Sequence, residues 1–394
     1  AVGRCLHKCC QCCRIWQPLW FWWLSRGTGN LRWRIRQPAL AAFLSEAGNR
    51  EAGFKAFLYC EPGYFINRFE EENMKSRSFF SLGAVLTAAS VAMFSMADMV
   101  GSRAAEAADK VKVGFVYLTT PGDHGWTYAH EIGRQQVEKH FGGKVETTYV
   151  ENVPEGPDSA RVIRELAKKG NDIIFTTSFG YMDHTLKVAK EFPDIKFDHI
   201  TGYKRAPNMA TGNIRFYEGR YVQGVVAGLM TKSNKIGYIA SFPIPEVIQG
   251  INAFGLGLRS VNKDATVSVI WVNTWYDPVK EADAAKVHIA EGADILAQHT
   301  DSPAMLQTAE KAGVFGFGQS SDMKAFAPKA QLFSSVNNWG PYYISQIQAL
   351  MDGSWTTGEG PDHWAGNTWA GMADDFLVLS AFENMPDDVA KAAP

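Results

Sequence analysis

The stretch "KVKVGFVYLTTPGDHGWTYAHEIG", residues 110–133, contains the pattern that decides the fold. Its first part, "VKVGFVYL", is an apolar run typical of a buried strand, and "YAHEIGRQQVEKH" has the pattern of a helix. Trp126 stands where the strand turns into the helix. A tryptophan there is costly to leave in water, and when buried it needs a partner for its indole N–H.

The same alternation continues along the chain. Strand-like runs such as "DIIFTTSF", "KIGYIASF" and "ADILAQHT" are mostly separated by helix-like segments such as "PDSARVIRELAKKG". Strand–helix alternation over this length predicts parallel sheets with helices on both faces, and about ten strands are too many for one small sheet. We therefore expect an α/β protein with two lobes, each a mainly parallel sheet. The best boundary is the turn-rich segment "APNMATGN", residues 206–213.

The first 107 residues differ in character from the rest. Six cysteines lie within residues 1–60, at Cys5, Cys9, Cys10, Cys12, Cys13 and Cys60. From Met74, a basic "MKSRSFF", an apolar "FFSLGAVLTAASVAMFSM" and the small-residue site "AEA" form the three parts of a secretory signal peptide. Such a peptide acts from an N-terminus. We therefore expect residues 74–107 to be a signal peptide cleaved near Ala107, and residues 1–73 to be non-native upstream translation without ordered structure.

A Trp- and Cys-rich N-terminal module is the alternative for residues 1–73. Its "CLHKCCQCC" does not have the paired C-x2-C spacing of a zinc site, and "WQPLWFWWL" is too short to span a membrane. Neither feature favours the module over upstream translation.

The remainder, residues 108–394, is acidic, with 26 Lys and Arg against 33 Asp and Glu, and it contains no cysteine. It does not have the basic footprint of a nucleic-acid-binding protein, and it is large enough to build a core without disulfides. No lipobox cysteine ends the apolar region. We expect a soluble periplasmic protein without a lipid anchor, a cofactor or a nucleic-acid partner.

Aromatic and short polar side chains recur where the predicted strands end. Ligands bind beyond the carboxyl ends of the strands in such sheets, and ring faces with a few placed polar groups suit a flat molecule with polar edges. Taken one at a time, the aromatic residues fit interlobe packing equally well; their recurrence at strand ends favours a cleft. The candidate ligand-binding residues are Trp126, Trp275, Phe179, Tyr276, Asp123, His124, His299, Asp301, Gln319, Ser320, Asp322 and Asn337. Trp339 follows the same pattern.

No catalytic or metal-binding set is evident. The chain shows no G-x-S-x-G, no Walker loop and no G-x-G-x-x-G opening the first predicted helix. His124 and His130 lie six residues apart on different sides of a helix start, which argues against a zinc pair. Asp322 could act as a base, but no nucleophile stands beside it in the sequence. We expect neither an enzyme nor a metal site.

Five motifs carry a resemblance to a known family. They are "GDHGWTYAHEIG", "FTTSFGYMD", "EGRYVQGVVAGLMTKSNKIGYIAS", "DPVKEADAAKVHIAEGADIL" and "GQSSDM", in this order between Lys110 and Pro386. The chain resembles the basic membrane protein family, the purine-nucleoside-receptor-like substrate-binding proteins of ABC transporters. The resemblance implies the type I periplasmic-binding-protein fold, no enzymatic activity, and two partners: a purine-like ligand and an inner-membrane permease.

The resemblance also implies domain boundaries. Partly on this basis, the late helix "GPYYISQIQALMDG" is expected to return to the first lobe. Lobe 1 would then comprise residues 108–213 and about 337–353. Lobe 2 would comprise residues 214–336 and about 354–394, with a loop after Gly353.

Site residues follow by position in the family motifs. The family stacks its base between aromatic rings from opposite lobes, and Trp126 and Trp275 resemble these two. Where the family has an Asp that binds ribose, this chain has Ser320. This departure favours a free nucleobase such as adenine over a nucleoside. A sugar or polyol receptor, a ligand-sensing regulator and a receptor for a sensor kinase remain as alternatives.

Overall fold

Two six-stranded sheets form the framework of the protein, for which a computed structural model describes residues 110–358 and 366–393. The expectations for residues 1–73 and for the signal peptide at 74–107 lie outside the described residues. Both sheets are mainly parallel and are covered by helices on both faces. The predicted α/β class with two lobes is therefore confirmed.

The first sheet has the strand order β11-β5-β4-β3-β1-β2, and every neighbouring pair is parallel. Its strands are β1 (Val111–Val116), β2 (Val145–Val150), β3 (Ile173–Thr176), β4 (Lys196–Ile200), β5 (Met209–Ile214) and β11 (Asn367–Ala370). Its helices are α1 (Gly125–Phe141), α2 (Pro157–Lys168), α3 (Met182–Glu191) and α8 (Gly340–Asp352). These elements are called the first lobe.

The second sheet has the order β12-β10-β9-β8-β6-β7, and only β12 runs antiparallel to its neighbour among the described strands. Its strands are β6 (Lys235–Ala240), β7 (Thr266–Trp271), β8 (Ile295–His299), β9 (Phe315–Ser320), β10 (Gln331–Asn337) and β12 (Leu377–Leu379). Its helices are α4 (Phe216–Met230), α5 (Pro245–Val261), α6 (Pro278–Ala290), α7 (Ala304–Ala312) and α9 (Asp387–Ala392). These elements are called the second lobe.

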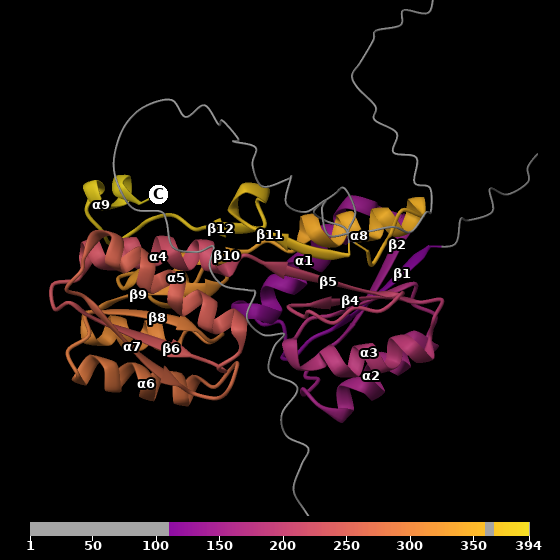
Figure 1. Ribbon diagram of the computed structural model, residues 1–394, viewed down its shortest axis with the longest axis horizontal. Coiled ribbons are helices and arrows are strands. Elements are labelled where there is room, and N and C mark those ends of the chain that lie inside the picture. The colour runs from indigo at the N-terminus through magenta and orange to yellow at the C-terminus, as the bar shows by residue number, and fades with distance from the viewer. Residues whose placement is uncertain (1–109, 359–365, 394) are drawn as a thin grey trace, which may run out of the picture. The chain divides into compact units, whose positions relative to one another are not determined.

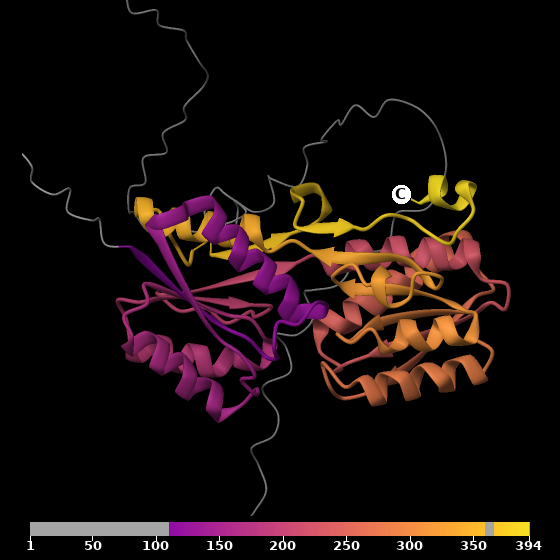
Figure 2. The ribbon, with the colours of Figure 1, turned by 180° about the vertical axis from the view of Figure 1, so that it is seen from behind.

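Each sheet separates two hydrophobic cores, because successive side chains of a strand point to opposite faces. In β1, Phe115 packs with α1 and α8, whereas Val116 packs with α2 and α3. In β6, Tyr238 packs with α4 and α5, whereas Ile239 packs with α6 and α7. The first lobe shows these layers in Figure 1, with α8 above the strands and α2 and α3 below; Figure 2 shows α1 on the same side as α8.

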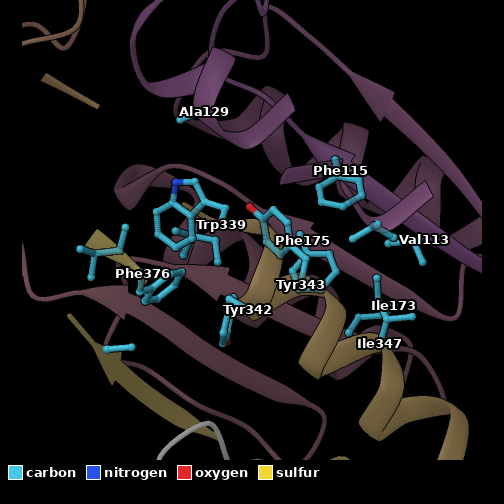
Figure 3. Close-up of a cluster of buried hydrophobic side chains, with 14 of the residues drawn as sticks. Val113, Phe115, Ala129, Ile173, Phe175, Trp339, Tyr342, Tyr343, Ile347 and Phe376 are labelled. Atoms are coloured by element: carbon cyan, nitrogen blue, oxygen red, sulfur yellow. The ribbon is translucent and has the colours of Figure 1, made fainter. Parts of the chain in front are cut away.

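The return of α8 to the first lobe is visible in its core. Figure 3 shows Tyr342, Tyr343 and Ile347 of α8 beside Phe115 and Phe175 of the sheet. The ring of Tyr343 lies 5.1 Å from that of Phe115 and 4.5 Å from that of Phe175. Burying an aromatic side chain of this kind contributes roughly 1.5–3 kcal/mol, so these rings fix the helix to the sheet.

Local signals in the sequence explain where several helices begin and end. Helix α2 begins at Pro157, and Gly170 follows its last turn with a φ of +77°. Helix α6 begins after Asp277, whose carboxylate accepts hydrogen bonds from the backbone N–H groups of Val279 and Lys280. Among the described helices, none combines the length and apolar content that a membrane span requires.

The chain crosses between the sheets three times in the described residues, after β5, after β10 and after β11. The last crossing differs from the expected boundaries, which assigned residues after 353 to the second lobe. Strand β11 instead extends the first sheet, pairing in parallel with β5 from Asn367↔Thr211 to Ala370↔Ile214. Such an edge strand of four residues, with Trp369 in a Gly-rich context, is too short to distinguish from a loop by periodicity.

Both sheets reverse their strand order at the strand next to one edge. In the first sheet β2 lies on one side of β1 and β3 on the other; in the second, β7 and β8 flank β6 in the same way. Open α/β sheets bind ligands beyond the carboxyl ends of strands at such reversals. We therefore expect a ligand site at the loops after β1, β3, β6 and β8.

Candidate functional site

A cavity lies where the strand ends of the two lobes meet. The space between its walls, open solvent included, is about 350 Å³. Its lining residues are Leu118, Trp126, Ser178, Phe179 and Thr201 from the first lobe, and Glu246, Trp275, His299, Asp301 and Gln319 from the second.

Trp126 is held in a fixed orientation on the first turn of α1. Its indole N–H donates a hydrogen bond of 2.6 Å to the backbone oxygen of Thr177. The edges of the ring pack against His130, at 4.5 Å between centroids, and against Trp339, at 5.4 Å. The half-buried indole thus has its polar group satisfied within the first lobe, while part of its surface lines the cavity.

Trp275 faces the same cavity from the loop after β7. Its indole N–H donates a hydrogen bond of 3.2 Å to Glu155 of the first lobe, and its ring packs at 5.1 Å from Phe242. The carboxylate of Glu155 also accepts hydrogen bonds from Ser178 Oγ (2.6 Å) and from the backbone N–H of Gly180 (2.7 Å). Among the described ring contacts, none joins Trp275 to Trp126, so the two indoles do not fill the space themselves.

The polar lining combines two carboxyl groups with a neutral imidazole. Glu246 Oε1 lies 3.6 Å from Nε2 of His299. Burial lowers the pKa of His299, although Glu246 acts in the opposite direction. Burial raises the pKa of Asp301 well above its ordinary value, and the nearby Glu281 raises it further. The neutral form of Asp301, which this shift favours, has a carbonyl acceptor and an O–H donor, whereas the side chain of Glu246 adds carboxyl acceptors to the same part of the wall.

A buried arginine lies behind the cavity wall. Arg220 of α4 is 1% exposed, and its guanidinium donates hydrogen bonds to Oε1 of Gln223 and to Oε1 of Gln319. Gln223 in turn donates to the backbone oxygen of Gly318 at 3.5 Å. Gln319 is thus the wall residue that connects the cavity to α4.

Contacts around the cavity join the lobes. The backbone N–H of Gly125 donates a hydrogen bond of 2.8 Å to Ser321 Oγ in the second lobe. His124 stacks on Tyr276 at 6.1 Å and meets the edge of Phe326 at 5.0 Å. These contacts describe a closed arrangement, in which the strand ends of the lobes touch.

Two residues near the cavity have left-handed backbone conformations that non-glycine residues seldom adopt. Thr201, which lines the cavity after β4, has a φ of +67°. Ser320, the last residue of β9, has a φ of +63° and follows Gln319. Such conformations cost about 1–3 kcal/mol and concentrate at functional sites. One occurs in each lobe.

The twelve predicted site residues fall into two groups. Half of them line the cavity, namely Trp126, Phe179, Trp275, His299, Asp301 and Gln319. Ligand contact by these residues stays a prediction.

The other six lie elsewhere. Asp123, His124 and Tyr276 form a cluster in which His124 bonds to Asp123 at 2.8 Å and stacks on Tyr276 across the lobes. Ser320 and Asn337 are buried and are not part of the cavity lining. Asp322 is exposed and accepts hydrogen bonds from Gln331 and from the backbone N–H of Lys324.

The sequence interpretation did not select four lining residues. Leu118, Ser178 and Thr201 stand within two residues of the ends of β1, β3 and β4, so a stricter use of the strand-end rule would have found them. Glu246 lies on the first turn of α5, after a loop that separates it from β6. Its place depends on how that helix packs, which no local pattern reveals.

Trp339 belongs to the core and not to the cavity. It is fully buried, its ring stacks on His130 at 4.5 Å, and it packs among the aromatic side chains in Figure 3. No group of three or more His, Cys, Asp or Glu side chains within residues 110–358 and 366–393 is arranged to hold a metal ion.

Known proteins resemble this chain in sequence and in fold. A family model described as ABC transporter substrate-binding protein PnrA-like matches residues 110–370. The chain is 56% identical over 290 residues to a purine-binding protein of Brucella abortus, covering 74% of this chain and 81% of that protein. It is 41% identical over 269 residues to TsgA13 of Haloferax volcanii, named as a glucose-binding protein of an ABC transporter, covering 68% of each.

A solved structure shares the architecture. An ABC transporter solute-binding protein from Conexibacter woesei superposes with a TM-score of 0.57 at 20% identity, covering 72% of this chain and 93% of that one. At this identity the likeness concerns the fold alone.

Proposed function

From the premise that the chain belongs to the PnrA-like family of ABC transporter substrate-binding proteins, we propose that it binds a purine nucleobase between its lobes and delivers it to an importer. The proposal includes an exported, periplasmic location and the absence of catalysis. The ligand is an adenine-like base, held between Trp126 and Trp275. The name of the Brucella abortus relative supports the purine class.

One observation carries the proposal: the indoles of Trp126 and Trp275, from different lobes, line the same cavity and do not pack on each other. Each has its N–H bonded within the protein, so the ring faces are the parts left for a ligand. Stacking of a base on an aromatic ring contributes roughly 1–3 kcal/mol, and two faces contribute about 2–6 kcal/mol.

Hydrogen bonds must supply the binding free energy that stacking on the two rings does not. Micromolar affinity corresponds to about 8 kcal/mol, which exceeds what two rings provide. Glu246 and Asp301 offer carboxyl acceptors to an exocyclic amine, and Gln319 offers an amide. A buried acceptor left without a donor is penalised, so Glu246 favours an amino over a keto edge.

The free base is favoured over the nucleoside by Ser320. This side chain, at the family position of a ribose-binding aspartate, is fully buried, and its hydroxyl has no hydrogen-bond partner among the described residues. No carboxylate is therefore present at that position to bind two sugar hydroxyl groups.

The lobes are expected to close on the ligand because each lobe carries only part of the site. Each lobe alone offers one indole face and part of the polar lining, whereas the closed state offers both. The ligand therefore shifts the population toward the closed state, which a permease can recognise on the outer surfaces of the lobes.

The proposal is tested by the mass of the small molecule that is released when the purified protein is denatured. Calorimetric titration then compares adenine, hypoxanthine, adenosine and glucose on ligand-free protein. We expect adenine to bind most tightly. Glucose binding without purine binding would overturn the proposal and would give the chain the ligand that is named for TsgA13. Loss of ligand mass on incubation would reveal an enzyme instead.

A further inference from the structure

Arg220 is a buried cation without an anionic partner. It is 1% exposed, and no described carboxylate lies within 4.0 Å of its guanidinium. Its hydrogen bonds go to the amide oxygens of Gln223 and Gln319 instead, and its Nε has no described partner. Burying a guanidinium is costly, and an ion pair is the usual compensation. The burial of Arg220 without an ion pair therefore is not explained by a gain in folding stability.

The guanidinium fixes which way the amide of Gln319 faces. Arginine has donors only and cannot accept a hydrogen bond, so the group facing it must be the amide oxygen. The orientation of Gln223 is determined in the same way, with its oxygen toward Arg220 and its nitrogen toward the backbone oxygen of Gly318. This chain of contacts leaves one orientation for Gln319, with its nitrogen away from Arg220.

The nitrogen of Gln319 is left for the cavity. No described residue accepts a hydrogen bond from it, although Gln319 is 2% exposed and lines the cavity. This nitrogen is also not fully enclosed by the described residues. The adjacent positive charge also polarises the amide, which strengthens the N–H as a donor.

We infer that Arg220 is a specificity-determining positioning residue: by holding the oxygen of Gln319, it makes this side chain a donor toward the ligand. The inference rests on the proposed purine site. A free glutamine can bond adenine through both its oxygen and its nitrogen. Here only the nitrogen is available, so Gln319 selects a ring nitrogen acceptor, while Glu246 or Asp301 must accept from the exocyclic amine.

The test uses purines that differ in one acceptor. Adenine is compared by calorimetry with 1-deaza-, 3-deaza- and 7-deazaadenine, in each of which a C–H replaces one ring nitrogen. In the native protein, one analogue should bind about 5- to 100-fold more weakly than adenine, because it leaves the Gln319 donor without a partner. The ratio of the two affinities is the readout, since a merely structural role would not change it.

Three variants separate positioning from folding. Gln319→Glu keeps an acceptor for Arg220 but offers the ligand no N–H, so the ratio should fall to within about twofold of one. Arg220→Met frees the amide of Gln319 to rotate, and the ratio should shrink. Arg220→Lys keeps a donor toward Gln319, so the affinity ratio should lie between those of Arg220→Met and the native protein. Thermal unfolding of each variant identifies any that fail to fold, in which case Gln319→Glu carries the test.

Each outcome has a defined meaning. A native ratio retained in Gln319→Glu, or in a folded Arg220→Met, would overturn the inference while leaving purine binding intact. The absence of any weakened deaza analogue in the native protein would overturn it as well. If the native protein binds none of these purines, the proposed function fails, and the inference fails with it.

Discussion

Trp275 and Glu155, which belong to different lobes, are joined by a hydrogen bond of 3.2 Å from the indole N–H to the carboxylate. The same carboxylate accepts from Ser178 Oγ and from the backbone N–H of Gly180, both in the first lobe. Glu155 therefore connects the loop after β3 to an aromatic wall of the cavity. This contact exists only when the lobes are closed, because the first lobe contributes the acceptor and the second the donor.

Glu155→Gln is expected to weaken ligand binding by about 10- to 150-fold, the equivalent of one charged hydrogen bond of roughly 1.5–3 kcal/mol. The new amide nitrogen must face at least one of three donors that the carboxylate satisfies. Calorimetry measures the affinity, and small-angle scattering measures the ligand-dependent compaction. Glu165→Gln is the control, because it removes an exposed carboxylate whose one ion pair among the described residues is with Arg161, one turn away. Equal affinity in the two variants would contradict the interlobe role.

Trp126→Ala and Trp275→Ala are each expected to weaken purine binding by about 1–3 kcal/mol without unfolding the protein. Tyr203→Ala is a control that also removes an aromatic ring. Tyr203 is 67% exposed, lies outside the cavity lining and makes no described ring contact. Fluorescence titration of all three variants checks the prediction. Native affinity in both tryptophan variants would exclude stacking between the two rings.

The framework of the fold could be predicted because its signals are local. Strand β1 and helix α2 follow directly from their periodicity, and Gly170 ends the latter with a positive φ. The strand-end rule also located half of the predicted residues at the cavity, including Trp126 and Gln319. These residues lie at the ends of strands that the parallel topology brings to one edge.

The burial of Trp339 and the contacts of Arg220 and Glu155 depend on packing that no local sequence pattern encodes. Trp339 follows β10 as Trp126 follows β1, yet it is fully buried, because α8 folds back onto the first sheet. Arg220 stands in a helix that is apolar nearly all round, and its role becomes visible only when α4 lies behind β9. Glu155 is an ordinary loop residue in the sequence. The partner that joins it to the second lobe is a tryptophan 120 positions away.

Asp198 is expected to make stability depend on pH. It is fully buried in β4; Tyr342 donates a hydrogen bond of 2.7 Å to one of its oxygens, and the other has no described partner. Burial raises the pKa of Asp198 from its ordinary value near 3.8 to about 7, against the opposing effect of Tyr342. Between these values the folded state holds a proton that the unfolded state has lost. The contribution of Asp198 to stability therefore falls as pH rises from about 4 to 7, by at most about 1.4 kcal/mol per pH unit.

Asp198→Asn isolates this effect, because the amide does not titrate. The free energy of unfolding of the variant minus that of the native protein should increase from pH 4 to pH 7 and level off above. This difference cancels the opposite trend from His199, whose pKa burial lowers to about 3. Denaturant titrations at each pH supply the values. A difference that is constant with pH would contradict the raised pKa of Asp198.

Gly125→Ala is expected to block closure. Gly125 has a φ of +78°, and an added Cβ would lie 2.6 Å from the backbone oxygen of Asp301 in the other lobe. That oxygen cannot move aside as the end of a flexible side chain could, so the lobes must stay further apart. Since both lobes line the proposed ligand site, affinity should fall by more than about tenfold, roughly 1.4 kcal/mol.

The matched control is Gly142→Ala, at the other end of the same helix. Gly142 also has a positive φ, of +56°, but an added Cβ would meet no atom within 4 Å. This substitution carries the backbone strain of about 1–3 kcal/mol without the interlobe contact, so it should lower the unfolding temperature and leave ligand affinity unchanged. Scattering should show ligand-induced compaction in Gly142→Ala and none in Gly125→Ala. Compaction and affinity that are equal in the two variants would mean that the approach of Gly125 to Asp301 does not limit closure.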